Sequence, residues 1–162
     1  MIHCAKESTA NQTEKSVKRR RPRATSCGQK ETMKIREIKE LLHCRVLCGE
    51  EMLDRDVHSA CGSDMMSDVL AFVKDQAVLI TGLVNPQVIR TAQMMDICCI
   101  VFVRGKMPSQ DVIDLARETG IVLLFSSERM YSACGILYQA GLQAGSVAGD
   151  LPNTGEVMVE NT

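Results

Sequence analysis

Aromatic side chains and long hydrophobic runs are both scarce in this 162-residue chain. Tryptophan is absent and only 3% of residues are aromatic, so the core must consist of aliphatic, methionine and cysteine side chains. No apolar run reaches the roughly 18 residues of a membrane-spanning helix, and the N-terminal segment lacks the hydrophobic stretch of a secretory signal. We therefore expect a cytoplasmic protein without a membrane partner, whose eight cysteines are thiols.

Signatures of catalysis and of cofactor binding are missing too. The chain has no GxxxxGK[ST] phosphate loop, no GxGxxG after a strand and no GxSxG elbow. Cys98 and Cys99 fall in one predicted strand and are expected to point to opposite faces of the sheet. Five other potential metal ligands lie close in sequence but lack the CxxC pairs typical of zinc sites: His43, Cys44, Cys48, His58 and Cys61.

The sequence thus predicts a protein that is not an enzyme and that holds no metal or other cofactor. Two alternatives stay open at this point. One is a cysteine-based redox or metal-binding accessory protein, and the other is an enzyme of unknown reaction.

Charge is distributed unevenly along the chain. Residues 1–32 hold eight Lys/Arg against three Asp/Glu, a net charge of +5, while the whole chain carries −1, so residues 33–162 sum to −6. An acidic body argues against a nucleic-acid partner, because dedicated nucleic-acid-binding folds carry their basic patch on the structured part. The exception is the basic run from Lys18 to Arg23, which either contacts phosphates by charge alone, is simply solvated, or lies upstream of the natural start at Met33.

These patterns predict three segments: a disordered basic extension over 1–32, an α/β domain over 33–142 and a flexible acidic tail over 143–162. Within the domain, three short apolar runs at 77–81, 97–103 and 121–125 alternate with segments of helical periodicity, which is typical of a parallel sheet. Asn85-Pro86 is a helix-start signal, and Gly120 is a helix-end signal. Further elements are expected as helices over 32–44, 65–73, 85–95, 110–119 and 127–141, and as strands over 45–48 and 57–61.

Ligands of parallel sheets bind outside the carboxyl ends of the strands. Thr81-Gly82, Arg104 and Ser127 follow three predicted strands, and Asn85, Ser109 and Ser127 stand at predicted helix starts. Unpaired N–H groups at helix starts favour anions, and an arginine adds a bidentate contact. The plainer interpretation is that these residues only cap helices.

Three stretches resemble the DRTGG domain family: residues 60–70 (ACGSDMMSDVL), 79–92 (LITGLVNPQVIRTA) and 100–105 (IVFVRG). The pentapeptide Asp-Arg-Thr-Gly-Gly that names the family does not occur here. Members stand alone or accompany phosphate acetyltransferases and CBS-containing pyrophosphatases. The resemblance implies a three-layer α/β/α sandwich with a mainly parallel sheet, similar to the N-terminal domain of HPr kinase/phosphorylase.

The resemblance further implies a non-catalytic regulatory module, a homodimer, that senses a small anionic ligand such as an adenine nucleotide. Residues at predicted strand or helix ends are the candidate ligand contacts: Ser63, Asp64, Thr81, Gly82, Asn85, Arg104 and Ser127.

Overall fold

A five-stranded sheet in the order β2-β7-β6-β5-β4 forms the middle layer of the domain. The structure is a computed structural model that describes residues 32–73 and 76–145. Strands β4 to β7 are parallel, whereas β2 pairs antiparallel with β7 at one edge. The sheet strands are β2 (Arg45–Cys48), β4 (Ser59–Gly62), β5 (Ala77–Thr81), β6 (Cys99–Phe102) and β7 (Val122–Phe125).

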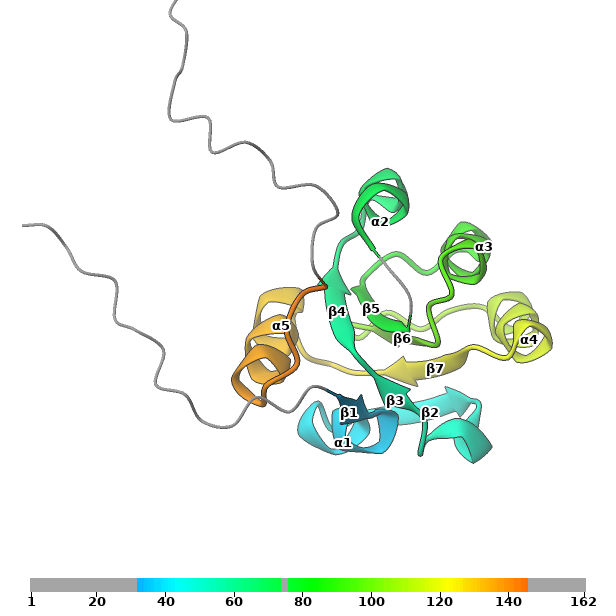
Figure 1. Ribbon diagram of the computed structural model, residues 1–162. Helices are drawn as coiled ribbons and strands as arrows, with labels where there is room; N and C mark the ends of the chain where they lie inside the picture. Colours follow the sequence, from blue (N-terminus) through cyan, green and yellow to red (C-terminus); the bar gives the residue numbers. More distant parts are fainter. Residues whose placement is uncertain (1–31, 74–75, 146–162) are drawn as a thin grey trace, which may run out of the picture.

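Helices cover both faces of this sheet, as Figure 1 shows. One face carries α2, α3 and α4, and the other carries α1 and α5. A two-stranded antiparallel ribbon, which the sequence pattern did not predict, lies beside α1. The remaining elements are β1 (Met33–Lys34), α1 (Ile35–Leu41), the 3-10 turn η1 (Glu50–Met52), β3 (Asp56–Val57), α2 (Met66–Phe72), α3 (Pro86–Met94), α4 (Gln110–Thr119) and α5 (Met130–Gln139).

The central strands are buried on both sides, which explains their continuous apolar runs. Every residue of β5 and β6 is buried. Neighbouring residues belong to different cores: Val78 packs with α1 and α5, and Leu79 packs with α2, α3 and α4. The predicted three-layer α/β sandwich with a mainly parallel sheet is therefore confirmed.

Local signals placed two helix ends correctly. The Asn85 side chain accepts a hydrogen bond from the Val88 N–H at 3.3 Å, and Pro86 opens α3. Gly120 ends α4 with a φ of +70°, a conformation that glycine adopts without a Cβ penalty. Both helices therefore begin or end where their capping residues predict.

Two predictions about individual residues are wrong. Helix α5 begins at Met130 after the cap residue Arg129, so Ser127 is not at a helix start. The neighbouring Ser126 is buried instead, and its hydroxyl donates to the Leu42 carbonyl at 2.8 Å, which holds this segment in a loop. Strand β6 begins at Cys99, and Cys98 just before it packs in the same core as Cys99.

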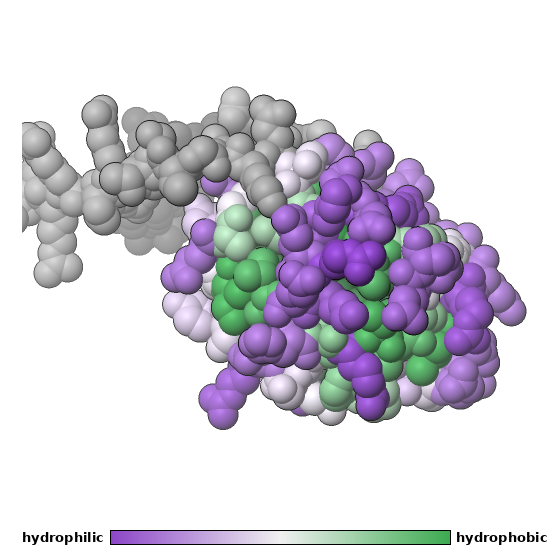
Figure 2. Space-filling model, turned by 90° about the horizontal axis from the view of Figure 1, so that it is seen from below, coloured by the Kyte–Doolittle hydropathy of each residue, from purple (hydrophilic) through white to green (hydrophobic). Residues whose placement is uncertain are grey.

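Figure 2 looks onto the β2 edge of the molecule and shows two hydrophobic areas separated by a band of hydrophilic side chains. Exposed hydrophobic surface is thus divided on this face.

None of the helices in the described ranges is long and apolar enough to cross a membrane. The basic extension predicted over 1–32 and the tail predicted over 143–162 lie almost entirely outside the described residues.

Candidate functional site

The loops that follow the parallel strands meet at one edge of the sheet. The Ser63 N–H donates to the Ile80 carbonyl at 3.1 Å, which joins the loop after β4 to the carboxyl end of β5. The Val103 N–H donates to the Thr81 carbonyl at 3.0 Å and joins the loop after β6 to the last residue of β5. This carboxyl edge brings together four of the seven candidate residues, namely Asp64, Thr81, Gly82 and Arg104.

The Asp64 carboxylate is the centre of this group. It accepts hydrogen bonds from the Gly82 N–H at 2.7 Å and from the Thr81 hydroxyl at 3.1 Å, and it pairs with the Arg104 guanidinium. The Leu83 N–H donates to the Thr81 oxygen at 3.1 Å, which leaves the hydroxyl proton for Asp64. We call Asp64, Thr81, Gly82 and Arg104 the Asp64 cluster.

Hydrogen bonding makes Asp64 a stable anion. Partial burial opposes ionisation, but the bonds from Gly82, Thr81 and Arg104 outweigh it, so the pKa of Asp64 lies below its ordinary value of 3.8. The carboxylate is therefore ionised at neutral pH. The donors of the cluster thus bind a carboxylate of the chain itself, that of Asp64.

Gly82 and Arg104 fit each other by shape. A Cβ on residue 82 would overlap the Arg104 guanidinium, so only glycine leaves room for this packing. Arg104 has a φ of +65°, an uncommon conformation for a residue with a side chain. Its N–H donates to the Glu128 carbonyl at 2.7 Å, so the segment before α5 holds the arginine in place. Such strained positions are enriched at functional sites.

The other candidates do not join the cluster by hydrogen bonds. The Ser63 hydroxyl accepts from the Met65 N–H at 3.0 Å, and Asn85 caps α3. Neither Ser63 nor Asp64 is the cap of α2, because Met65 occupies that position and Asp64 turns to the neighbouring loops. Ser127 is exposed in the loop before α5.

Four of the cysteines that the structure describes are small buried core side chains: Cys44, Cys48, Cys98 and Cys99. Burial raises the pKa of Cys44 to about 11, and the same cause raises the pKa of Cys99, which is fully enclosed. A raised pKa lowers the fraction of reactive thiolate. Within residues 32–73 and 76–145, no group of three or more His, Cys, Asp or Glu is placed to hold a metal ion.

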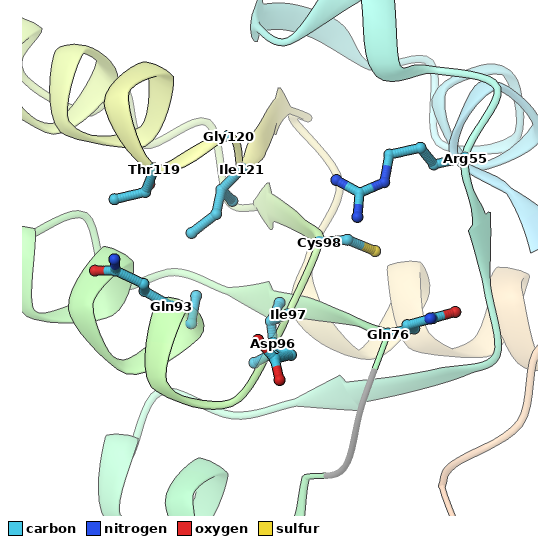
Figure 3. Close-up of a pocket in the computed structure, with 10 residues that line it drawn as sticks. Arg55, Gln76, Gln93, Asp96, Ile97, Cys98, Thr119, Gly120 and Ile121 are labelled. Carbon is cyan, nitrogen blue, oxygen red and sulfur yellow. The ribbon is translucent and has the colours of Figure 1, made fainter.

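A hollow of about 420 Å³ lies at the opposite edge of the sheet, where β5, β6 and β7 begin (Figure 3). Its polar lining includes Arg55, Gln76, Gln93 and Asp96. The sequence did not indicate this hollow, because ligands of parallel sheets are expected at the carboxyl ends of the strands. The sequence signal for it is weak, because Gln76 and Asp96 are simply polar residues before apolar runs. In the structure both residues adopt positive φ.

The fold and the Asp64 cluster together define a three-layer α/β domain whose polar groups converge where its parallel strands end. The sequence matches the DRTGG domain family over residues 37–140, more than half of the chain, so the chain belongs to that family. A search of curated proteins found no significant match.

A solved structure supports the same fold. It is the crystal structure of the CBS and DRTGG domains of the regulatory region of Clostridium perfringens pyrophosphatase, complexed with the activator diadenosine tetraphosphate. The TM-score is 0.54 at 16% identity, and the match covers 71% of this chain and 50% of that one. The chain thus spans about half the length of that regulatory region, and at this identity the likeness concerns the fold.

Proposed function

We propose that this protein is a non-catalytic cytoplasmic regulatory module that senses a small anionic ligand, an adenine nucleotide, at the Asp64 cluster. The observation that carries the proposal is the convergence of the Thr81 hydroxyl, the Gly82 N–H and the Arg104 guanidinium on one carboxylate. Donors that hold a carboxylate oxygen also suit a phosphate oxygen, and arginine binds both in the same bidentate way. The pyrophosphatase relative, whose regulatory region is named with an adenine dinucleotide activator, supports the choice of nucleotide.

In this proposal the ligand phosphate exchanges with the Asp64 carboxylate. Asp64 lies between β4 and α2, so its release changes the loop that leads into α2. The donors themselves remain anchored, because the Thr81 carbonyl accepts from the Val103 N–H and the Arg104 N–H donates to the Glu128 carbonyl. A ligand that favours the released state shifts the population of that loop, which is the physical requirement for a sensor.

The chemistry of the cluster supports a role without catalysis. General acid–base catalysis needs a group whose pKa lies near the working pH. Asp64 is the carboxylate of the cluster, and its pKa is lowered, away from neutrality. A permanently ionised carboxylate pairs with donors but does not deliver a proton at neutral pH.

The test is a thermal-shift and calorimetric titration with ADP, ATP and diadenosine tetraphosphate. A bound ligand raises the melting temperature by mass action. We expect the wild type to respond, Arg104→Gln to lose the response, and the control Arg90→Gln, an exposed arginine on α3, to keep it. The proposal fails if no nucleotide at millimolar concentration shifts the melting temperature of the wild type.

We further propose that the protein is a homodimer that uses the outward face of α5. This helix exposes Tyr131 at 91% and Tyr138 at 63%, and exposed aromatic side chains mark interaction surfaces. Light scattering of the wild type and of the double variant Tyr131→Ser/Tyr138→Ser tests this. A wild-type monomer at high concentration would contradict it.

A further inference from the structure

The hollow at the amino-terminal edge of the sheet is separate from the Asp64 cluster. Figure 3 shows Gln93 and Thr119 on one side of it and Arg55 and Gln76 on the other. Buried side chains of Ile97, Cys98 and Ile121 lie between them. Its volume, about 420 Å³, falls within the range of small-molecule sites, roughly 300–1,000 Å³.

Two opposite charges line this hollow without neutralising each other. Within the described part of the chain, neither Arg55 nor Asp96 forms an ion pair. The only side-chain hydrogen bond of the Arg55 guanidinium there is a weak one, 3.9 Å to the Met52 sulfur. Nearly all of its donors are therefore available to a partner that enters the hollow.

The rest of the lining is amphipathic. In the described ranges, the amides of Gln76 and Gln93 make no side-chain hydrogen bond. Helices α3 and α4 both end at the hollow, beside Asp96 and Gly120 respectively. The negative ends of the two helix dipoles favour a positive charge in the hollow, and α3 ends directly before Asp96.

We propose that this hollow is a binding site for a small zwitterion of the amino-acid class. The ligand carboxylate pairs with Arg55 in a bidentate contact. The ligand ammonium lies against Asp96 and the carbonyl ends of α3 and α4. The amide of Gln93 meets a polar ligand side chain, and Ile97 and Ile121 contact its carbon stem.

A zwitterion fits this arrangement better than a simple anion or cation does. A lone carboxylate would leave Asp96 and the helix ends without a positive partner, and a lone amine would leave Arg55 without a negative one. Either ligand would also bring its own charge toward a like charge of the protein. The site lies at the opposite edge of the sheet from the Asp64 cluster, so either proposal can fail without affecting the other.

The experiment is a calorimetric titration of the full chain with the twenty standard amino acids. For each amino acid that binds, the matched compounds without the ammonium group and without the carboxylate group are titrated too. We expect at least one amino acid to bind with a Kd of about 1 mM or tighter, and removal of either charge to weaken binding by about tenfold or more. These comparisons use the unmodified protein and do not depend on how a variant folds.

Variants then place the site. Arg55→Gln and Asp96→Asn should each weaken binding by about tenfold, while Arg90→Gln and Asp111→Asn, matched exposed controls, should leave it within about twofold. The proposal is overturned if no amino acid binds at about 10 mM. It is also overturned if the uncharged analogues bind equally well, or if folded Arg55→Gln and Asp96→Asn proteins bind like the wild type.

Discussion

Replacing Asp64 by asparagine removes the negative charge of the cluster and leaves its hydrogen-bond donors in place. The asparagine oxygen can still accept from the Gly82 N–H, but the side chain is neutral and no longer pairs with Arg104. If a ligand phosphate must displace Asp64, the free energy that Asp64 contributes to the unliganded state opposes binding. Asp64→Asn should therefore lower stability and raise affinity for the anion.

The magnitude follows from the exposure of the two side chains. Arg104 and Asp64 are 39% and 43% exposed, so their ion pair contributes no more than about 1 kcal/mol. Loss of charge from the bonds to Gly82 and Thr81 adds a similar amount, for a total of about 1–2 kcal/mol. The same free energy corresponds to an increase in anion affinity of about 5–30-fold.

Urea unfolding measures the first quantity, and calorimetric titration with diadenosine tetraphosphate or ATP measures the second. Asp68→Asn is the control, because Asp68 is an exposed acid in the first turn of α2 whose carboxylate makes no hydrogen bond or ion pair in the described part of the chain. It should change neither stability nor affinity appreciably. An Asp64→Asn protein that is destabilised but binds the anion no better than the wild type would refute the exchange mechanism.

Acidification provides an independent check on Asp64. A group whose pKa is lowered in the folded state stabilises the protein above its ordinary pKa and loses that effect as the pH falls through the folded value. The stability difference between wild type and Asp64→Asn should thus be constant from neutral pH down to about pH 5 and shrink below the ordinary value of 3.8. Urea midpoints at a series of pH values measure it, and a difference that grows in acid would contradict the assignment.

Three further predictions concern shape and burial. Gly82→Ala should drive Arg104 away from Asp64 and abolish the nucleotide response while it lowers the free energy of unfolding by about 1 kcal/mol at most; an unchanged response would contradict the shape argument. A Cβ would meet no other atom at either Gly120 or Gly135, so only the backbone conformation decides the effect of alanine there. Gly120→Ala should lower the free energy of unfolding by about 1 kcal/mol because of its positive φ, whereas Gly135→Ala inside α5 should raise it by up to about 1 kcal/mol because alanine favours the helix. Effects of the same sign would refute this. Cys99 should resist a thiol reagent until urea unfolds the protein, as mass-spectrometric mapping would show, and rapid labelling in the native state would contradict its burial.

The elements of the central sheet were predictable because their signals are local. Strand β5 and helix α4 have the predicted bounds, since a continuous apolar run indicates a strand buried on both faces and periodicity indicates an amphipathic helix. Prediction was poorer where contacts outweighed local pattern. The start of α5 was placed too early, because nothing near Ser126 in the sequence indicates that its hydroxyl bonds to Leu42, 84 residues away.

The candidate site divides in the same way. The sequence by itself determined that Thr81 ends one parallel strand and that Gly82 and Arg104 follow such strands, so that all three lie at one edge, because parallel strands have their carboxyl ends at the same edge of the sheet. Only the tertiary structure decided that Asp64 fills the space among them, since its partners lie 17, 18 and 40 residues away and their geometry depends on how the loops pack. The same holds for the hollow at the other edge, where Arg55 and Asp96 come from elements that share no sequence pattern. Hydrophobic periodicity predicts which face of a helix or strand is buried. A binding site depends on which side chains come into contact, and tertiary packing determines that.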